Sequence, residues 1–428
     1  MNTWIQRRIG LFIKRGILSE IRDHLSKPEI TVITGPRQSG KTTLVRILEE
    51  ELKKAGKSTM YFNLDIEEDS IYFRSQMNFL RKIKLEIGEE EGFIFIDEVQ
   101  RIKNAGIFLK GLYDMNLPYK FIVTGSGAID LKGKIQESLV GRKRIFELDT
   151  ISFEEFVNYR TSYRYEEKLE DFFEVEKERT LNFLDEYLQF GGYPRVVTEE
   201  TAREKHQVIR EIFNSYLEKD VTGLLRVMKV HSFSLLIRTL GILVGRILNF
   251  SNLSSLTGIS EKTLKEYLYY LQRTYIIDLI TPFFTNRLKE LVKTPVCYFR
   301  DIGMRNYAAG EYGNVKDHGF VFQNFIYLRL KELSRRYDFT IHYWRSKDKA
   351  EVDFVLRKGE KLLPVEVKWH VGRVISIPRS LRSFMNRYDL DLALIVTLNS
   401  HAHLGHGKTD IMILPFHEID SLVEEYFR

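Results

Sequence analysis

The sequence predicts an α/β protein in which an N-terminal parallel-sheet region and a C-terminal α/β region flank a mainly helical middle. Three observations support this prediction. Residues 30–150 alternate short apolar runs with helical patterns, residues 153–284 are mainly helical, and strand patterns return from Pro295 onward. A chain of 428 residues, 43% of them hydrophobic, is long enough for two to four domains with separate cores.

In the N-terminal region, four apolar runs are short enough to be fully buried strands of a parallel sheet. They are Ile30–Thr34, Met60–Leu64, Phe93–Ile96 and Phe121–Thr124. Helical patterns separate them, including residues 42–55 and 71–87. This alternation predicts a sheet with helices on both faces.

In the middle of the chain, residues 251–273 predict a short helix, a turn at Gly258 and a second helix with Ser260 as candidate N-cap. The second helix should bury Leu264, Leu268 and Leu271 and expose Lys262, Lys265 and Glu266. Residues 275–284 are a candidate wing, with Arg287 and Lys289 beyond it. Such a module can place its second helix in the DNA major groove, or it can serve only protein contacts and packing.

The C-terminal region shows a different order of elements. A helix near residues 318–337 precedes three strands, and a further helix is followed by two more strands. The three strands are 339–344, 351–356 and 361–368, the helix is 378–388, and the last strands are 392–397 and 411–415. This α-β-β-β-α-β order predicts a second α/β unit with its own core.

Composition excludes several classes of protein. A single cysteine excludes a disulfide framework and fits a reducing compartment, so we expect a cytoplasmic protein. Since no apolar run approaches the roughly 18 residues of a membrane span, we expect no membrane association. The net charge of +6 permits nucleic-acid binding without establishing it. Acidic residues are in excess only in residues 151–228, between basic flanks.

A phosphate-binding loop is the strongest motif. Residues 35–42 match G-x-x-x-x-G-K-[ST] after an apolar strand and before a helix. Glycines let the backbone turn its N–H groups onto phosphate oxygens, and the helix N-terminus adds attraction. Lys41 should reach the β- and γ-phosphates of ATP, and Thr42 should bind Mg²⁺. The candidate nucleotide-binding residues are Gly35, Pro36, Arg37, Gln38, Ser39, Gly40, Lys41, Thr42 and Thr43.

Two carboxylates follow the apolar run at residues 93–96. Asp97 and Glu98 would lie at the carboxyl edge of the sheet, where ligands bind in open α/β folds. Asp97 would hold Mg²⁺, and Glu98 would orient the attacking water or accept its proton. The alternative is that the pair caps the next helix.

Further candidates lie downstream. Thr124 or Ser126 would sense the γ-phosphate, although Thr-Gly-Ser is also ordinary turn chemistry. Arg142 or Arg144 would reach the nucleotide of a neighbouring subunit as an arginine finger, or belong to a basic surface loop. Arg195 is a weaker candidate for a second sensor.

These motifs together resemble a widespread archaeal and bacterial family of AAA+ ATPases. The resemblance rests on GPRQSGKT (35–42), FIFIDEVQ (93–100), VTGSGA (123–128), Gly141-Arg142, FEEF (153–156) and GGYP (191–194). It implies a P-loop NTPase core at residues 1–150, a helical lid at 151–228, a winged-helix module at 229–290 and a C-terminal domain at 291–428.

The C-terminal domain in turn resembles the PD-(D/E)xK nuclease superfamily, with its restriction-endonuclease-like fold, through EVDFVL (351–356) and PVEVK (364–368). The resemblance implies that Asp353 and Glu366 hold Mg²⁺ and that Lys368 is catalytic. Gln323 departs from the pattern, because the superfamily often has an acidic residue on the preceding helix.

The leading functional hypothesis is a Mg²⁺-dependent AAA+ ATPase whose ATP hydrolysis drives domain movements. The expected target of this ATPase is duplex or branched DNA, and a homo-oligomer is a candidate assembly. One alternative is an ATP-dependent nuclease that cuts DNA through the C-terminal site. Another is a nucleotide-gated switch that binds a protein partner and uses both C-terminal modules only structurally.

Overall fold

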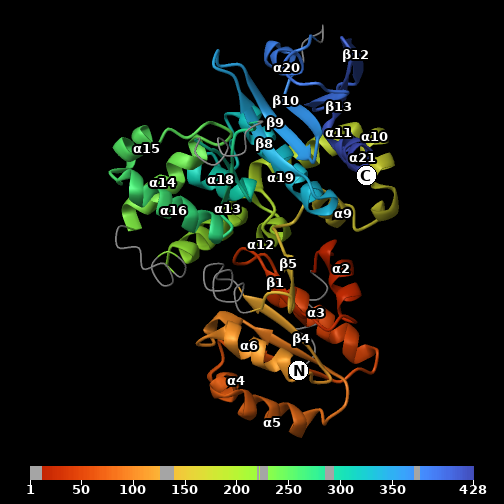
Figure 1. Cartoon of the computed structure of the whole chain (residues 1–428), viewed down its shortest axis with the longest axis vertical. Coiled ribbons are helices and arrows are strands. Elements are labelled where there is room, and N and C mark those ends of the chain that lie inside the picture. The colour runs from red at the N-terminus through yellow and green to blue at the C-terminus, as the bar shows by residue number, and fades with distance from the viewer. Residues whose placement is uncertain (1–11, 126–138, 219–220, 222–229, 285–293, 371–375) are drawn as a thin grey trace. The chain divides into compact units, whose positions relative to one another are not determined.

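The computed structural model describes residues 12–125, 139–218, 221, 230–284, 294–370 and 376–428 (Figure 1). The chain forms two compact units, each built from three separate segments. Unit 1 contains residues 1–163, 192–228 and 269–276, and unit 2 contains residues 164–191, 229–268 and 277–428.

Unit 1 is built on a five-stranded sheet in the order β2-β3-β4-β1-β5. Its strands are β1 (Ile30–Thr34), β2 (Thr59–Asn63), β3 (Gly92–Asp97), β4 (Tyr119–Gly125) and β5 (Lys143–Glu147). Every neighbouring pair is parallel. This all-parallel sheet confirms the predicted α/β class. The edge strand β5 was not predicted, because its sequence, KRIFE, has only one fully buried residue.

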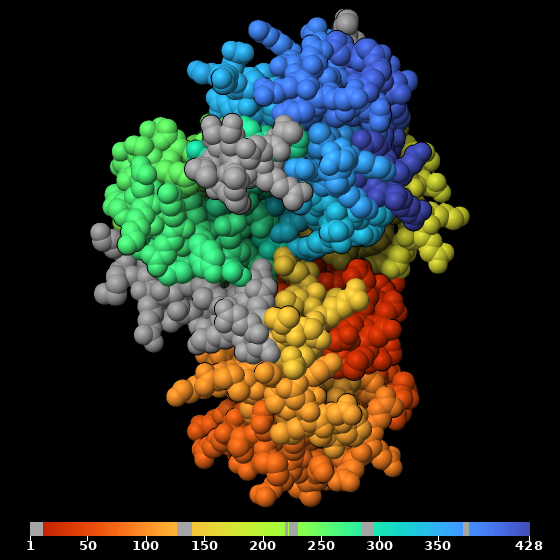
Figure 2. Space-filling model, in the orientation of Figure 1, coloured from red at the N-terminus to blue at the C-terminus, as the bar shows by residue number. Residues whose placement is uncertain are grey.

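Helices cover both faces of this sheet. They are α2 (Ile17–His24), α3 (Lys41–Lys54), α4 (Glu67–Ser70), α5 (Gln76–Glu86) and α6 (Ala105–Asp114), with 3₁₀ turns η1 (Ile71–Arg74) and η2 (Val99–Arg101). Alternation along the strands supplies two cores. Ile30 and Val32 of β1 pack with α5 and α6, whereas Ile33 packs with α2 and α3. Figure 2 shows the outer surface of α4 to α6 in orange.

The rest of unit 1 is helical. Its helices are α9 (Phe153–Arg160), α12 (Pro194–Thr198) and α13 (Ala202–Ser215). Capping boxes begin α9 at Ser152 and α13 at Thr201, because each N-cap side chain accepts a hydrogen bond from the backbone three residues later. Pro194 occupies the first turn of α12, where its missing N–H costs nothing.

Unit 2 begins with helices and a pair of short strands. Its elements are η4 (Glu166–Lys168), α10 (Leu169–Val175), α11 (Lys177–Phe190), α14 (Val230–Ile242), α15 (Phe250–Thr257), α16 (Glu261–Arg273), β6 (Ile277–Ile280), β7 (Val296–Phe299) and α18 (Ile302–Ala309). Residues 269–273 of α16 belong to unit 1. The two helices and the turn predicted at residues 251–273 are present. Gly258 has a φ of 66° at the end of α15, and Leu264, Leu268 and Leu271 are buried. The strands β6 and β7 pair antiparallel.

The second sheet has six strands in the order β12-β13-β11-β10-β9-β8. Its elements are α19 (His318–Tyr337), β8 (Thr340–Arg345), β9 (Glu351–Lys358), β10 (Lys361–Lys368), α20 (Arg379–Met385), β11 (Leu392–Thr397), β12 (Ala402–His406), β13 (Thr409–Pro415), η6 (Phe416–Glu418) and α21 (Ile419–Phe427). The predicted α-β-β-β-α-β order is confirmed. The strand β10 pairs antiparallel with β9 and parallel with β11, so the sheet is mixed.

Within the described part of the chain, none of the helices combines the length and the apolar composition that a bilayer crossing requires.

Candidate functional site

The loop of residues 35–40 joins β1 to α3 and depends on glycine at two positions. Gly35 has a φ of 151°, and a Cβ atom there would lie 2.1 Å from the Leu148 carbonyl oxygen. Gly40 has a φ of 98°. Both values lie in the region that side chains disfavour, so the loop geometry requires these glycines. It is the backbone shape from which N–H groups can converge on an anion.

The side chain of Lys41 folds into this loop. Its Nζ donates hydrogen bonds to the carbonyl oxygens of Gly35, at 3.0 Å, and Pro36, at 2.7 Å. Only 5% of Lys41 is exposed. The hydroxyl of Ser39 is also buried, and no described residue is its hydrogen-bond partner. A buried ammonium and a buried hydroxyl in a glycine loop suit a phosphate ligand.

Asp97, at the end of β3, gathers hydroxyl groups from three other elements. Its Oδ2 accepts hydrogen bonds from Thr42, at 2.8 Å, and from Tyr61, at 2.7 Å. Its Oδ1 accepts one from Thr124. Burial and the charge of Asp97 raise the pKa of Tyr61, so its hydroxyl stays a donor. Because the Thr42 hydroxyl and the Asp97 carboxylate meet at a strand end, this pair fits a Mg²⁺ ion of a nucleotide complex.

Glu98 follows Asp97 in a left-handed conformation, with a φ of 60°. Its backbone N–H donates to the Thr124 hydroxyl at 3.3 Å, and its carboxylate accepts from the Gln100 amide. A non-glycine residue in this conformation costs energy and often marks a functional site. Because of this conformation, the side chain of Glu98 does not continue the alternation of side chains along β3, which ends at Asp97.

The predicted second-sensor residue lies against the loop. Arg195 Nη1 donates to the Gln38 side chain at 3.3 Å, and its Nη2 contacts Glu211 at 3.2 Å. The ring of Pro194 would lie 3.9 Å from a Cβ atom on Gly40. The start of α12 therefore borders the phosphate-binding loop.

Arg142 lies elsewhere. Its backbone carbonyl accepts from Ile30 N–H at the amino end of β1, whereas the loop follows the carboxyl end of that strand. Its guanidinium pairs with Asp114 at 2.7 Å. Five residues of strand, about 16 Å, separate the two edges, so the Arg142 backbone lies far from the loop of its own chain. Arg144 is exposed, and Ser126 lies outside the described residues.

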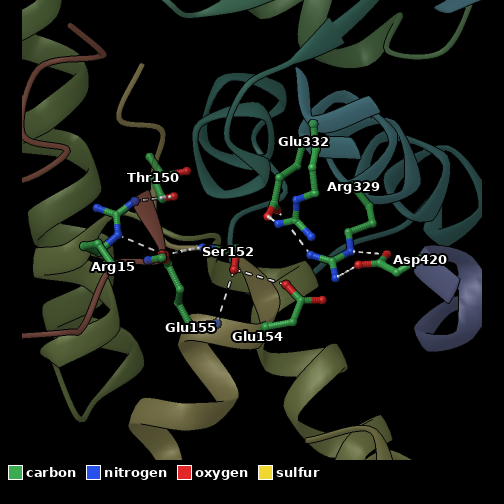
Figure 3. A network of polar contacts seen from close by, with 10 residues as sticks. Arg15, Thr150, Ser152, Glu154, Glu155, Arg329, Glu332 and Asp420 are labelled. Atoms are coloured by element: carbon green, nitrogen blue, oxygen red, sulfur yellow. Dashed lines mark hydrogen bonds and ion pairs between the residues drawn. The ribbon is translucent and has the colours of Figure 1, made fainter. Parts of the chain in front are cut away.

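Sequence reasoning missed three residues that the fold brings to the loop. Arg15 donates to the Ser39 carbonyl and pairs with Glu155 (Figure 3). Tyr275, which has a φ of 63°, donates its buried hydroxyl to Thr34 at 2.8 Å, next to Gly35. Of these residues, only Glu155 lies in a recognisable sequence motif, since Ser152-x-x-Glu155 is a capping-box pattern.

The structure also brings together the predicted C-terminal residues. Asp353 accepts hydrogen bonds from the Gln323 amide at 2.9 Å and from the Val367 N–H at 2.8 Å, one on each oxygen. Glu366 Oε1 pairs with Lys368 at 2.8 Å. Glu366 Oε2 is buried, and no described residue is its hydrogen-bond partner.

Electrostatics oppose a doubly charged pair of carboxylates at this site. Burial, with the charge of Glu366, raises the pKa of Asp353 well above its ordinary value. Burial lowers the pKa of Lys368, but Glu366 and Asp353 together raise it above its ordinary value. Among the described residues, no cluster of three or more His, Cys, Asp or Glu could hold a metal ion. With both Asp353 oxygens engaged, the donor set fits a resident Mg²⁺ poorly.

The exposed face of α16 carries mixed charges. Lys262 and Lys265 are exposed as predicted, and so are Glu261 and Glu266. Arg287 and Lys289 lie outside the described residues.

Comparison with known protein families yields three matches. Residues 27–157 match the family model of an AAA domain. Residues 181–313 and 318–419 match two different domains of unknown function, DUF8612 and DUF4143. The AAA domain match covers the loop, Asp97 and Glu98.

Relatives extend over most of the chain. An uncharacterized protein of Methanocaldococcus jannaschii is 26% identical over 346 residues, which are 79% of this chain and 74% of the relative. Uncharacterized proteins of Mycobacterium bovis and Mycobacterium tuberculosis are 24% identical over 419 residues, 96% of this chain and 85% of each relative.

Among solved structures, DnaA of Aquifex aeolicus bound to AMPPCP is 15% identical, covering 60% of this chain and 86% of that chain, with a TM-score of 0.26. The ORC1 protein of Aeropyrum pernix in complex with DNA is 12% identical, with 70% and 94% coverage and a TM-score of 0.28. A DNA replication initiation factor is 17% identical, with 53% and 65% coverage and a TM-score of 0.27.

Proposed function

We propose that this protein binds ATP with Mg²⁺ and hydrolyses it in unit 1. The observation that supports the proposal best is the 2.8 Å hydrogen bond between Thr42 and Asp97, which joins the two predicted nucleotide motifs at one sheet edge. The buried Ser39 hydroxyl, which has no partner among the described residues, and the ammonium of Lys41 beside it supply further polar groups for a triphosphate.

In this proposal each residue has a separate task. Backbone N–H groups of residues 35–42 and the Lys41 ammonium bind the phosphates. Mg²⁺, held by Thr42 and Asp97, supplies positive charge to the phosphate oxygens. Glu98 orients the attacking water and accepts its proton, with Thr124 holding the Glu98 backbone. Arg195 adds charge from the side of α12.

Calorimetric titration of ATP and ADP, combined with steady-state turnover, tests the proposal. Lys41→Ala should abolish nucleotide binding, whereas Glu98→Gln should retain binding and lose at least about 100-fold in kcat. Lys53→Ala and Glu91→Gln are matched controls, because both residues are exposed and each makes an ion pair outside the site, Lys53 with Glu49 and Glu91 with Lys57. Unchanged turnover in the Lys41 and Glu98 variants would refute the assignment.

We further propose that the hydrolysis drives movements of the lid (151–228) and the winged-helix module (229–290), and that the target is DNA. The helix-turn-helix geometry and the pI near 9.0 support a DNA partner. The four charged residues exposed on α16 sum to zero, so this helix face offers no net positive charge to DNA phosphates. Binding to duplex and branched DNA, measured with and without ATP, should weaken steeply with salt. Binding independent of salt would favour a protein partner instead.

An arginine finger acts on the nucleotide of a neighbouring subunit, so this role for Arg142 predicts a homo-oligomer. If Arg142 acts on a neighbouring subunit, Arg142→Ala and Glu98→Gln proteins, each inactive alone, should recover turnover when mixed. The recovery arises because one mixed interface combines an intact Glu98 with an intact Arg142. Full activity of Arg142→Ala alone would remove this role.

A second candidate function is DNA cleavage at the C-terminal site. It is favoured by the meeting of Asp353, Glu366 and Lys368 and by the Glu366 oxygen that has no partner among the described residues. The Gln323 amide on Asp353 speaks against it. Mg²⁺-dependent cutting that Asp353→Ala abolishes would support the nuclease, and no cutting of duplex, branched or single-stranded DNA would exclude it.

A further inference from the structure

Arg15 is a buried arginine whose three guanidinium nitrogens all donate hydrogen bonds within unit 1. Only 8% of the residue is exposed. Its nitrogens donate to the carbonyl oxygens of Ser39 at 3.0 Å, Asp149 at 2.7 Å and Thr150 at 3.0 Å, and to Glu155 Oε2 at 2.9 Å. Figure 3 shows Arg15 with Thr150 and Glu155. The residue lies just before α2, outside the phosphate-binding motif.

The contact with Ser39 fixes one peptide plane of the loop. The Ser39 carbonyl and the Gly40 N–H belong to the same trans peptide, so they point in opposite directions. The guanidinium holds the Ser39 carbonyl oxygen toward Arg15. The Gly40 N–H must therefore point away from Arg15. The Gly40 amide is one of the donors that a phosphate-binding loop presents to its ligand.

Glu155 holds the guanidinium in turn. Its Oε2 accepts from Arg15 Nε, and its Oε1 accepts from the Gly16 N–H at 2.8 Å. The same carboxylate closes the capping box of Ser152 at the start of α9. A single carboxylate therefore ties the loop, the segment before α2 and the first turn of α9 to one another.

We propose that Arg15 is a positioning residue that aims the Ser39–Gly40 peptide at the triphosphate. The proposal rests on the proposed ATP site and adds a determinant outside its motif. Lysine cannot replace arginine here, because the planar guanidinium reaches several acceptors at once and the ammonium group cannot.

The test uses Arg15→Lys in the full-length protein, with inorganic tripolyphosphate and ATP as calorimetric probes. We expect the affinities for tripolyphosphate and for ATP to fall equally, by about tenfold, because the lost contact is to the phosphates that both probes share. The KM for ATP should rise, with kcat little changed. Arg22→Lys is the matched control, since Arg22 makes a similar pair with Glu51 on the exposed surface and should bind both probes normally.

Glu155→Gln is the second variant. It keeps Arg15 but removes a charged partner, so the affinity for tripolyphosphate should fall two- to fivefold. A folded variant of either kind with wild-type tripolyphosphate affinity overturns the proposal, as does a loss confined to ATP. If wild-type protein binds neither probe, the ATP site itself is wrong, and this outcome is distinct from the failure of Arg15 alone.

Discussion

Removing the Tyr275 hydroxyl should loosen the strand that leads into the nucleotide loop. Tyr275 and Thr34 are each only 2% exposed, and their hydroxyls are 2.8 Å apart. Tyr275→Phe leaves the Thr34 oxygen without its donor, which costs about 1–2 kcal/mol for a buried group. The exchange of the β1 amides, read by mass spectrometry, should then accelerate by about 5- to 30-fold.

A double-mutant cycle sharpens this prediction. Thr34→Val alone leaves the Tyr275 hydroxyl without its acceptor and should lower the free energy of unfolding by a similar amount. The double variant instead buries two apolar groups of matching shape. The double variant should therefore be less destabilised than the sum of the single variants by at least about 1 kcal/mol. Tyr119→Phe combined with Thr34→Val is the control, because Tyr119 lies about 20 Å away at the other end of the sheet. Additive costs in the Tyr275 cycle would refute the reasoning.

Three other predictions concern particular sites. Burial, with the charge of Lys120, lowers the pKa of His24 to about 4. The unfolded chain thus binds more protons between pH 4 and 6.5, and urea-unfolding midpoints should fall as pH drops through this window in the wild type but less in His24→Asn. Gly35→Ala should abolish ATP binding because its Cβ meets a carbonyl oxygen at 2.1 Å; Gly88→Ala, with open space and a φ of 90°, should bind normally. Because the pKa of Asp353 is raised in the folded protein, the contribution of this residue to stability declines as pH rises. Asp353→Asn should therefore unfold at a higher urea concentration than the wild type at pH 8. A lower midpoint for the variant would contradict this.

The P-loop site was predictable because its motifs specify local backbone. A glycine loop after a buried strand determines where Lys41 and Thr42 lie, and parallel strands place Asp97 at the same edge. The C-terminal group was predictable for a similar reason, since Asp353 and Glu366 lie on paired strands.

The contacts around the loop were not predictable in the same way. Arg15 reaches Asp149 and Glu155 across about a third of the chain, and Tyr275 reaches Thr34 across more than half. No periodicity or motif signals such pairs, because they arise only when distant segments pack. The edge strand β12 was missed because its exposed residues, His403 and Gly405, are polar or small. The edge strand β5 was missed because Arg144 and Ile145 are both exposed, so the strand lacks a regular apolar alternation.

The chain passes between the two units five times, after residues 163, 191, 228, 268 and 276. No single cut can therefore release an intact unit 1, since a polypeptide ending at residue 150 lacks two segments of this unit. Recombination during evolution would face the same obstacle, so the two units are expected to be inherited as one piece.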